Sequence, residues 1–363
     1  MEPPIPVYAS GNRSNSSPNI SLRGSSGRRW TWVPSPYTSQ MQPVAIIATV
    51  LNEVQDIARL VPSLLAQTPP AAEIVIVDGG STDGTWDWLV SAARDHPALR
   101  PIRDESCNLR NSPGPISRGR NLAIANTGSE IIACTDAGCT YPPDWLARIT
   151  APLLDGTADY ALGGSCLDLA DPTIWDLASA HFFGVKLSVE TPSKSCTARS
   201  MAFRKDLWRR IGGFPESVFF GEDTLFDRQA RHLAPPVFVQ RAKALYRPQY
   251  SFRSACRQLA RYAISDGIVG VRPARLLRNA ARCIIEVLAL IALHWSVAPL
   301  LFVLVLESWF AFRHNLPFLL RTGPRALLAR FLFSLVVPWI VAINQIRGSL
   351  TRKNPPNRQN LQP

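Results

Sequence analysis

The pattern of hydrophobic and polar positions changes at Val44, where the first long apolar run of the chain begins. Residues 44–53 have the composition of a buried strand that ends in polar side chains, and residues 54–67 then place apolar side chains at helical spacing. Residues 74–77 form a second apolar run, which stops at Asp78 and a glycine-rich polar turn. A strand, a helix and a strand in this order predict a right-handed βαβ unit and therefore a parallel sheet.

The alternation of helical and strand patterns continues beyond this unit. A helix is expected over residues 85–97, where a proline closes it, and another over residues 119–130. Residues 131–141 are expected to form a third strand, which again terminates in an aspartate, Asp136. These elements predict an α/β domain with a mostly parallel sheet flanked by helices.

Polar side chains follow three of the expected strands at one edge of the sheet. They are Asn52 and Glu53 on the first strand, Asp78 on the second and Asp136 on the third. Ligands of an open parallel sheet bind just beyond the carboxyl ends of its strands. The spacing therefore predicts a polar ligand site at this edge, although the turn after Asp78 taken alone is equally typical of an ordinary strand-to-helix loop.

Composition changes this picture at both ends of the chain. Residues 1–42 are rich in Ser, Pro, Asn, Gly and Arg and are interpreted as a disordered leader without the apolar core of a secretory signal. The seven cysteines are scattered without a CxxC pair, which is typical of reduced cysteines in the cytosol.

Residues 241–363 hold 18 Lys and Arg against 3 Asp and Glu. Because these charges alternate with long apolar runs, they favour an anionic membrane surface over nucleic acid as the partner.

Two apolar runs in the C-terminal region are candidate membrane segments. Residues 284–306 are long enough to cross a hydrocarbon core, whereas residues 326–346 are interrupted by Arg330 and Pro338 and are the weaker candidate. Arginines flank both runs, so the positive-inside rule does not place the loop between them. A two-span hairpin, a pair of re-entrant or interfacial helices, and a helix pair buried in a dimer are the three alternatives.

Five segments carry a resemblance to a known family. In chain order they are VLNE (50–53), VDGGSTDGT (77–85), RGRNLAIANTGSEIIACTDAG (118–138), AFRKDLWRRIGGF (202–214) and GEDTLFDRQAR (221–231). Together they resemble the family 2 inverting glycosyltransferases. The segment RQLARYAISDG (257–267) and the hydrophobic helices after it are most similar to the exopolysaccharide glucosyltransferases of the succinoglycan type.

The resemblance implies a GT-A nucleotide-binding sandwich followed by C-terminal hydrophobic helices. The expected organisation is a leader over 1–42, a catalytic domain over 43–268, membrane-associated helices over 269–350 and a basic polar tail over 351–363. A dinucleotide oxidoreductase is disfavoured because no GxGxxG follows the first strand.

The resemblance also implies which residues bind the nucleotide. Asp78 is expected to accept hydrogen bonds from the base, with Leu51, Asn52 and Glu53 closing its other side and Gly80 clearing space for the ring. Arg120 is expected to stabilise the diphosphate, because its planar fork forms two parallel charged hydrogen bonds. The alternative for Arg120 is a solvated helix residue.

Asp136 begins the segment that in the family carries an Asp-x-Asp metal motif. Here the segment is Asp136, Ala137, Gly138, so the second acidic residue is missing. The resemblance implies Mg²⁺ or Mn²⁺ as cofactor, and such ions prefer carboxylate oxygen. Asp136 is expected either to bind the ion with water molecules or to bind the ribose while another group helps the metal.

Asp223 is the expected catalytic base by resemblance, because inversion requires a carboxylate to take the proton of the acceptor hydroxyl. Its neighbour Glu222 is expected to support the acceptor site or the helix start. The alternative is that both carboxylates simply cap the helix that follows.

Gln258, Arg261 and Tyr262 form a QxxRY pattern where processive synthases of the family carry QxxRW. They are expected to contact the acceptor or the leaving diphosphate. For Tyr262, an anchor at the membrane interface is the alternative.

The function expected from these observations is a membrane-associated inverting hexosyltransferase of polysaccharide biosynthesis. It would move a sugar from a nucleotide sugar, a UDP-sugar in the first place, to a hydroxyl of a lipid-linked or growing glycan acceptor. Its expected location is the inner membrane with the catalytic domain on the cytoplasmic side. The alternatives are a polyprenyl-phosphate glycosyltransferase and an inactive membrane scaffold with the same fold.

Overall fold

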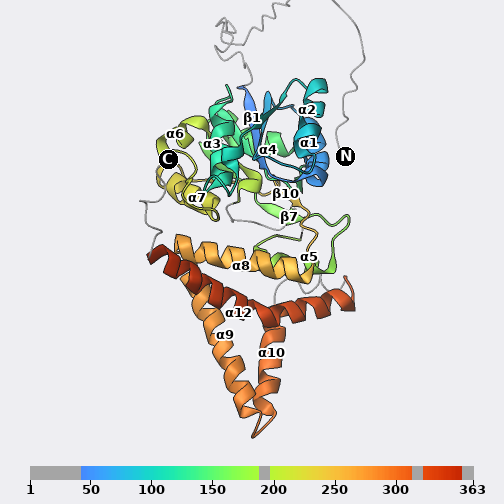
Figure 1. The fold of residues 1–363 in the computed structure, drawn as a ribbon, viewed down its shortest axis with the longest axis vertical. Helices are drawn as coiled ribbons and strands as arrows, with labels where there is room; N and C mark the ends of the chain where they lie inside the picture. The colour runs from blue at the N-terminus through green and yellow to red at the C-terminus, as the bar shows by residue number, and fades with distance from the viewer. Residues whose placement is uncertain (1–41, 188–196, 313–321, 354–363) are drawn as a thin grey trace, which may run out of the picture. The chain divides into compact units, whose positions relative to one another are not determined.

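A computed structural model describes residues 42–187, 197–312 and 322–353. They form a mixed α/β domain followed by long C-terminal helices (Figure 1). Nearly all of the expected leader, and most of the expected basic tail, lies outside the described residues.

The central sheet has seven strands in the order β3, β2, β1, β4, β8, β6, β9. Their bounds are β1 Val44–Val50, β2 Glu73–Asp78, β3 Leu99–Arg103, β4 Ile131–Cys134, β6 Tyr160–Leu162, β8 Met201–Arg204 and β9 Val237–Phe238. The first four strands in this order are parallel, and β8 is antiparallel to both β4 and β6. The predicted α/β class with a mostly parallel sheet is therefore confirmed.

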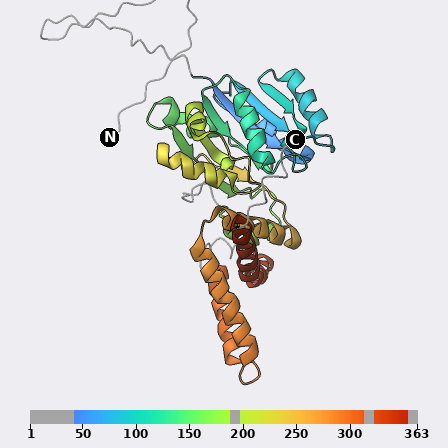
Figure 2. The same ribbon diagram turned by 60° about the vertical axis from the view of Figure 1, so that its left-hand side comes forward.

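Helices cover both faces of this sheet (Figure 2). Their bounds are α1 Val54–Leu65, α2 Thr85–Asp95, α3 Pro115–Ala125, α4 Trp145–Leu154, α6 Lys205–Ile211 and α7 Glu222–Leu233, with short 3₁₀ helices η1 Glu105–Cys107, η2 Ala180–Phe183 and η3 Ala198–Ser200. Because side chains alternate along a strand, Ile46 of β1 packs in the same cluster as α1 and α4, and Ile47 packs in the same cluster as α3 and α7.

Two expected elements differ in extent from their sequence patterns. Helix α3 begins at Pro115, earlier than expected, because proline suits the first turn of a helix. The expected strand 131–141 is divided after Cys134 by a turn in which Gly138 has a φ of 73°. The residues after this turn form β5 Cys139–Thr140, which joins β7 Ser165–Leu167 and β10 Ala244–Tyr246 in a second, three-stranded sheet.

The C-terminal region consists of helices that pack on one another. Their bounds are α5 Ile174–Ser179, α8 Phe252–Val269, α9 Pro273–Ala292, α10 Ala298–Phe312 and α12 Pro324–Lys353. Helices α8 and α12 approach backbone to backbone, because a Cβ on Gly267 would lie 2.2 Å from the Gln345 carbonyl oxygen and one on Gly348 would lie 2.1 Å from that of Ile264.

The apolar run 284–306 is not one continuous helix, which corrects its interpretation as a single span. Helix α9 ends at Ala292 and α10 begins at Ala298, so the two form a helical hairpin (Figures 1 and 2). The Ser296 hydroxyl oxygen accepts a hydrogen bond from the Ala298 backbone N–H at 3.1 Å, and Pro299 suits the first turn of α10. The chain therefore reverses within a segment whose composition is apolar enough for a helix.

The second run, 326–346, lies within α12. It is therefore the stronger candidate of the two for crossing a membrane, whereas the sequence pattern made it the weaker one. One helix of the described residues, Pro324–Thr351, is long and apolar enough to cross a membrane, and half of its apolar window is buried against the protein. Pro338 does not end this helix. It leaves the Ser334 carbonyl without its helical donor, and the buried Arg282 guanidinium donates to that oxygen at 3.1 Å.

Candidate active site

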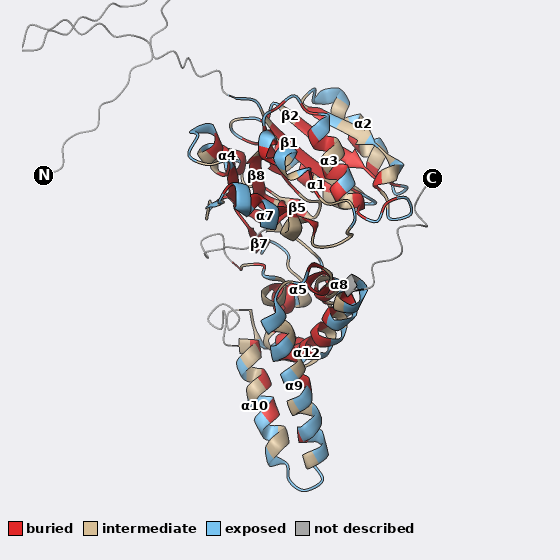
Figure 3. Ribbon diagram, turned by 90° about the vertical axis from the view of Figure 1, so that its left-hand side faces the viewer, coloured by how far each residue is buried: buried red, intermediate tan, exposed pale blue. Residues whose placement is uncertain are grey.

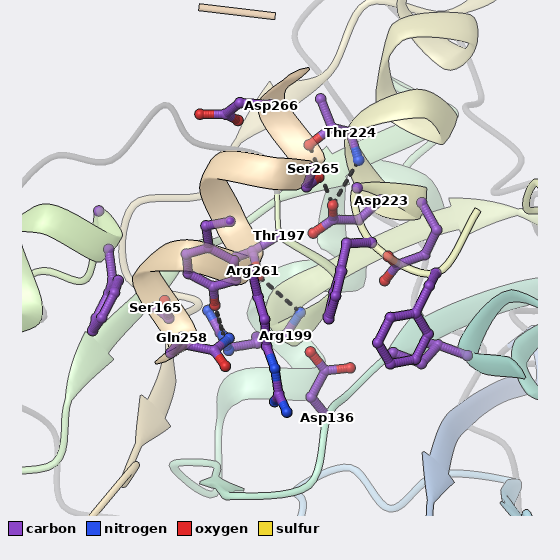
Figure 4. A pocket seen from close by; sticks show the side chains of 18 of the residues that line it. Asp136, Ser165, Thr197, Arg199, Asp223, Thr224, Gln258, Arg261, Ser265 and Asp266 are labelled. Carbon is purple, nitrogen blue, oxygen red and sulfur yellow. Dashed lines mark hydrogen bonds between the residues drawn. The ribbon is translucent and has the colours of Figure 1, made fainter. Parts of the chain in front are cut away.

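A cavity of about 950 Å³ lies at the carboxyl ends of β1, β2 and β4. It is also lined by residues of α7 and α8 (Figure 4). Residues of α9 line it as well. The cavity brings together most of the residues predicted from sequence: Leu51, Glu53, Arg120, Asp136, Glu222, Asp223, Gln258, Arg261 and Tyr262.

Two loops at this edge are tied together by hydrogen bonds. The Asn52 backbone N–H donates to Ser81 Oγ at 2.8 Å, and the Asn52 side-chain oxygen accepts from the Thr82 N–H at 2.9 Å. The Glu53 N–H donates to Thr85 Oγ1 at 2.9 Å. Asn52 therefore holds the loops in place, and its positive φ of 55° fits a residue type that tolerates this region. Direct contact of Asn52 with a nucleotide stays a prediction.

Asp78 is fully buried and organises the turn that follows β2. Its carboxylate accepts hydrogen bonds from the Ser81 hydroxyl and from the Ser81 backbone N–H, the latter at 3.1 Å. The described residues that line the cavity include Val77 and Gly79 but not Asp78. Asp78 therefore positions the turn after β2, and its contact with the base stays a prediction.

The glycines after Asp78 serve close packing. A Cβ on Gly79 would lie 2.5 Å from the Cys107 carbonyl oxygen, and Gly80 has a φ of 91°. Only Gly79 of these two is among the described cavity-lining residues, so the role predicted for Gly80 fits Gly79 better. The sequence signal was the glycine pair, which does not reveal which glycine faces the ligand.

Arg120 is the buried centre of the site. Its Nη2 donates to Asp136 Oδ1 at 2.6 Å and its Nη1 donates to Glu222 Oε1 at 2.8 Å. Because the Arg120 side chain is only 3 % exposed, the alternative of a solvated helix residue is excluded. Gly119 makes this burial possible, since a Cβ there would lie 2.6 Å from Thr49 of β1.

The two carboxylates at the start of α7 differ in their surroundings. Glu222 is buried, and this burial together with the neighbouring Asp223 charge raises the pKa of Glu222 to about 7, although Arg120 acts in the opposite direction. Asp223 lines the cavity, and its Oδ1 accepts from the Thr224 backbone N–H at 2.7 Å. Asp223 therefore binds a backbone N–H in the first turn of α7 and also faces the cavity, and its role as the base stays a prediction.

Glu53 is a second carboxyl with an altered pKa. Burial, a hydrogen bond with Asp56 and the nearby charges of Asp56, Asp83 and Asp136 raise the pKa of Glu53 to about 8. A protonated Glu53 can donate a hydrogen bond to an acceptor in the cavity, which suits a contact with an oxygen-rich ligand.

Helix α8 presents one face to the cavity. Gln258, Arg261, Tyr262 and Ser265 are spaced by three and four residues, and all line it (Figure 4). The Tyr262 hydroxyl accepts a hydrogen bond from Arg199 Nη2 at 3.0 Å, and the Arg199 guanidinium lies 4.2 Å from the Tyr246 ring centroid. Tyr262 thus positions a second arginine in the cavity.

Arg199 and Tyr246 were not predicted from the sequence. Arg199 lies in η3, and Tyr246 reaches the site because β10 pairs with β5 and β7. No motif marks either residue. The same holds for the arginines of α9 that line the far end of the cavity.

The residues do not form a metal site by themselves. Among the described residues, no three His, Cys, Asp or Glu side chains are grouped so that they could hold an ion. Asp136 is the carboxylate predicted to bind it, and one of its oxygens is bound to the Arg120 cation. A divalent ion would therefore depend on oxygens of a bound diphosphate and on water for most of its ligands.

Comparison with known proteins matches residues 45–213 to the family model "Glycosyl transferase family 2". The chain is similar to glycosyltransferase AglE of Haloferax volcanii, with 27 % identity over 201 residues, 53 % of this chain and 62 % of that protein. It is also similar to the succinoglycan biosynthesis protein ExoA of Rhizobium meliloti, with 28 % identity over 50 % of this chain and 56 % of ExoA. The similarity thus spans less than two thirds of the length of these relatives.

Two solved structures align with most of this chain at low identity. The mannosyltransferase PcManGT from Pyrobaculum calidifontis, in complex with GDP-Man and Mn²⁺, has a TM-score of 0.49 and 20 % identity over 85 % of this chain and 86 % of its own. S. aureus TarS 1-349 in complex with UDP has a TM-score of 0.46 and 17 % identity over 86 % and 91 % of the two chains. The family match ends at residue 213, before Asp223 and the cavity face of α8.

Proposed function

Because residues 45–213 form a domain of glycosyl transferase family 2, we propose that this chain transfers a sugar, with inversion, from a nucleotide sugar to an acceptor hydroxyl. The observation that carries the proposal is the buried Arg120, which joins Asp136 and Glu222 beside Asp223 in one cavity. In this arrangement Arg120 fixes Glu222 and the first turn of α7, so that Asp223 faces the cavity as a carboxylate base, while Arg199 and Arg261 supply the anion-binding groups.

The donor is assigned to the end of the cavity nearest the sheet. The nucleoside lies against the loops that carry Leu51, Glu53 and Gly79, which line this end. The diphosphate then lies toward Arg199 and Arg261, which also face the cavity. We assign a UDP-sugar as the first donor to test.

Asp223 is the base of this mechanism. As the acceptor oxygen attacks the anomeric carbon, its proton passes to the Asp223 carboxylate and the bond to the nucleoside diphosphate breaks with its electron pair. Negative charge then grows on the leaving diphosphate, where the guanidinium groups of Arg199 and Arg261 stabilise it. Arg120 holds Glu222 in place and so fixes the first turn of α7 that carries Asp223.

A divalent ion enters this proposal only together with the donor. Bound there, it would neutralise charge on the diphosphate, with Asp136 as its protein ligand. We expect Mg²⁺ or Mn²⁺ to raise turnover and excess chelator to lower it. Full activity in excess chelator would remove the ion from the reaction.

Membrane attachment is assigned to the α9–α10 hairpin and α12. The hairpin is largely exposed (Figure 3). Its helices carry Ile284, Leu288, Val305 and Trp309 and its turn carries Trp295, and each of these apolar side chains is at least 58 % exposed. Exposed apolar side chains of α12 also share one face: Leu328, Leu332, Trp339, Ile343, Ile346 and Leu350. Charge supports the same assignment, because Arg272 directly precedes α9 and Arg275 and Arg278 lie in its first two turns.

The lengths of the two helices favour insertion into one leaflet. Helix α10 has 15 residues and α9 has 20, the first of which carry the arginines. A complete crossing needs about 20 apolar residues in each helix. We therefore propose a re-entrant hairpin, with α12 in the interface and the catalytic domain on the cytoplasmic side of the inner membrane, where nucleotide sugars are available.

The experiment that tests the function is a screen of radiolabelled nucleotide sugars with membranes that carry the protein. We expect label from one donor to appear in a lipid or glycan fraction. Absence of transfer from every donor, with membranes that contain folded protein, would contradict the proposal.

A polyprenyl-phosphate glycosyltransferase is the second candidate, and the arginines of α9 in the cavity favour it. Its nucleophile would be a phosphate oxygen, which is already deprotonated at neutral pH and needs no base. A sugar-phosphate-lipid product formed equally well by Asp223→Asn would support this candidate over hydroxyl transfer.

A further inference from the structure

The cavity continues beyond the catalytic carboxylates to helix α9. This far end, which we call the basic end, is lined by Arg272, Arg275, Arg278 and Arg282 together with Asn279, Phe310 and Val337. The last three arginines and Asn279 are spaced by three, four and seven residues, so they share one face of α9. Nothing in the donor chemistry described above uses this end.

The charges of the basic end do not cancel. Asp266 is buried and is shared by Arg272 and Arg275, whose Nη1 atoms lie 2.6 and 2.8 Å from its two oxygens. Glu307 is buried and accepts from Arg282 Nε at 2.9 Å. Four arginines therefore face two carboxylates, and the excess positive charge is suited to an anion.

Arg278 is the arginine of this group that forms no ion pair or hydrogen bond among the described residues. It is exposed and faces the cavity. Burial lowers the pKa of Arg275, and Asp266 acts in the opposite direction. The positive charges of Arg272 and Arg278 lower the pKa of Arg275 further. An anion bound at Arg278 would relieve this repulsion.

The basic end is apolar on its other side. Phe310 of α10 and Val337 of α12 line it, and Arg282 stacks over the Phe310 ring at 4.3 Å from the centroid. The exposed apolar helices of the hairpin continue from there. A ligand that fits both sides carries an anionic group and a hydrocarbon chain.

We propose that the basic end binds the phosphate or diphosphate group of a lipid-linked acceptor, with Arg278 as its main contact. This inference rests on the proposed function, because it names the class of acceptor for the same site. It places the phosphate of the acceptor at α9 and its hydroxyl toward Asp223, at the other end of one continuous cavity.

Direct binding tests this inference independently of turnover. The full chain in detergent is titrated with radiolabelled farnesyl diphosphate, with farnesol as the lipid without phosphate and inorganic diphosphate as the phosphate without lipid. We expect farnesyl diphosphate to bind at least about tenfold more tightly than either, because both the charge and the chain contribute. Equal affinity for inorganic diphosphate would overturn the lipid assignment, and equal affinity for farnesol would overturn the phosphate assignment.

The variant Arg278→Ala should weaken farnesyl diphosphate binding about tenfold or more, and Arg278→Lys should restore part of it. Arg257→Ala is the matched control, because Arg257 is an exposed arginine of α8 that is not among the described cavity-lining residues. Affinity for UDP, measured in the same preparations, reports whether the donor end is folded.

Two further results would overturn the proposal. One is an Arg278→Ala variant that binds farnesyl diphosphate as tightly as the unaltered protein. The other is competitive displacement of farnesyl diphosphate by UDP, which would assign the basic end to the donor diphosphate. A failed donor screen with intact lipid binding would instead count against the proposed function and leave the binding site standing.

Discussion

At the scale of single residues, Arg120 has the clearest physical role. A guanidinium removed from water is costly unless it is paired, and here it is paired with Asp136 on one side and Glu222 on the other. The pairing joins the carboxyl end of the sheet to the first turn of α7. Arg120 therefore stabilises the fold and at the same time fixes Asp136 and Glu222 in the cavity.

Arg120→Ala should lower the free energy of unfolding by about 3 to 5 kcal/mol, because it leaves two carboxylates without their partner. It should also abolish transfer. Denaturant unfolding measures the first effect. Arg118→Ala is the matched control on the same helix, since its ion pair with Glu216 is exposed and should contribute less than about 1 kcal/mol. Equal stability of the two variants would contradict the role given to Arg120.

Glu222 gives the site a pH dependence whose sign follows from its pKa. The pKa of this carboxyl is raised from 4.5 to about 7 in the fold, so the folded state binds more protons than the unfolded state between these values. Its contribution to stability is therefore present below pH 4.5 and is lost as the pH rises to about 7. Glu222→Gln should remove this part of the pH dependence.

The measurement is the free energy of unfolding at pH 5 and pH 8 for the unaltered protein, for Glu222→Gln and for the control Glu130→Gln, whose carboxyl is exposed. We expect the loss between the two pH values to shrink in Glu222→Gln only. An unchanged loss in that variant would show that the Glu222 carboxyl is not the group that titrates.

At the scale of elements, the sequence predicted the sheet edge well and the turns poorly. The strands that end at Asp78 and near Asp136 are local patterns, and both form where their apolar runs predict. The division of residues 284–306 was not predictable from hydropathy, because Trp295 and Val297 of the turn are as apolar as the helices beside them. Apolar composition does not distinguish a helix from a turn at the tip of a hairpin.

The same limit applies to the site. Asp223, Arg120 and the QxxRY residues lie in short local motifs, and the structure brings all of them to one cavity. Arg199 joins them only because η3, β10 and α8 meet through long-range pairing, which leaves no local signal in the sequence. The sequence identified Asp78 by its position at the end of a strand. It did not show that the Asp78 carboxylate binds Ser81 in the turn that follows.

The hairpin tip gives a prediction at this scale. Glutamates in place of Trp295 and Val297, which are 76 % and 62 % exposed, should weaken binding of the chain to anionic liposomes. The reason is that a charge in the hydrocarbon region costs about 2.5 to 3.5 kcal/mol. Leu154→Glu, at an exposed apolar position of α4, is the control. Co-sedimentation with liposomes is the readout, and undiminished binding of the tip variant would contradict insertion.

At the scale of the whole molecule, one cavity connects the carboxyl end of the sheet with the base of the hairpin. The chain positions these parts through α8, whose cavity face carries Gln258, Arg261 and Tyr262 and which also packs against α12 and α5. The basic third of the sequence, which at first indicated only a membrane surface, also supplies the arginines at the far end of the cavity. This organisation fits a transferase that takes its donor from water and its acceptor from a lipid.

The central claim is that Asp223 is the base for attack by an acceptor hydroxyl, and Asp223→Asn tests it most directly. Transfer from the donor found in the screen should fall by a factor of about 10² to 10⁴, while UDP affinity stays close to that of the unaltered protein. Asp206→Asn, at an exposed position of α6, is the control and should keep full activity. Transfer at the unaltered rate by Asp223→Asn would contradict the account.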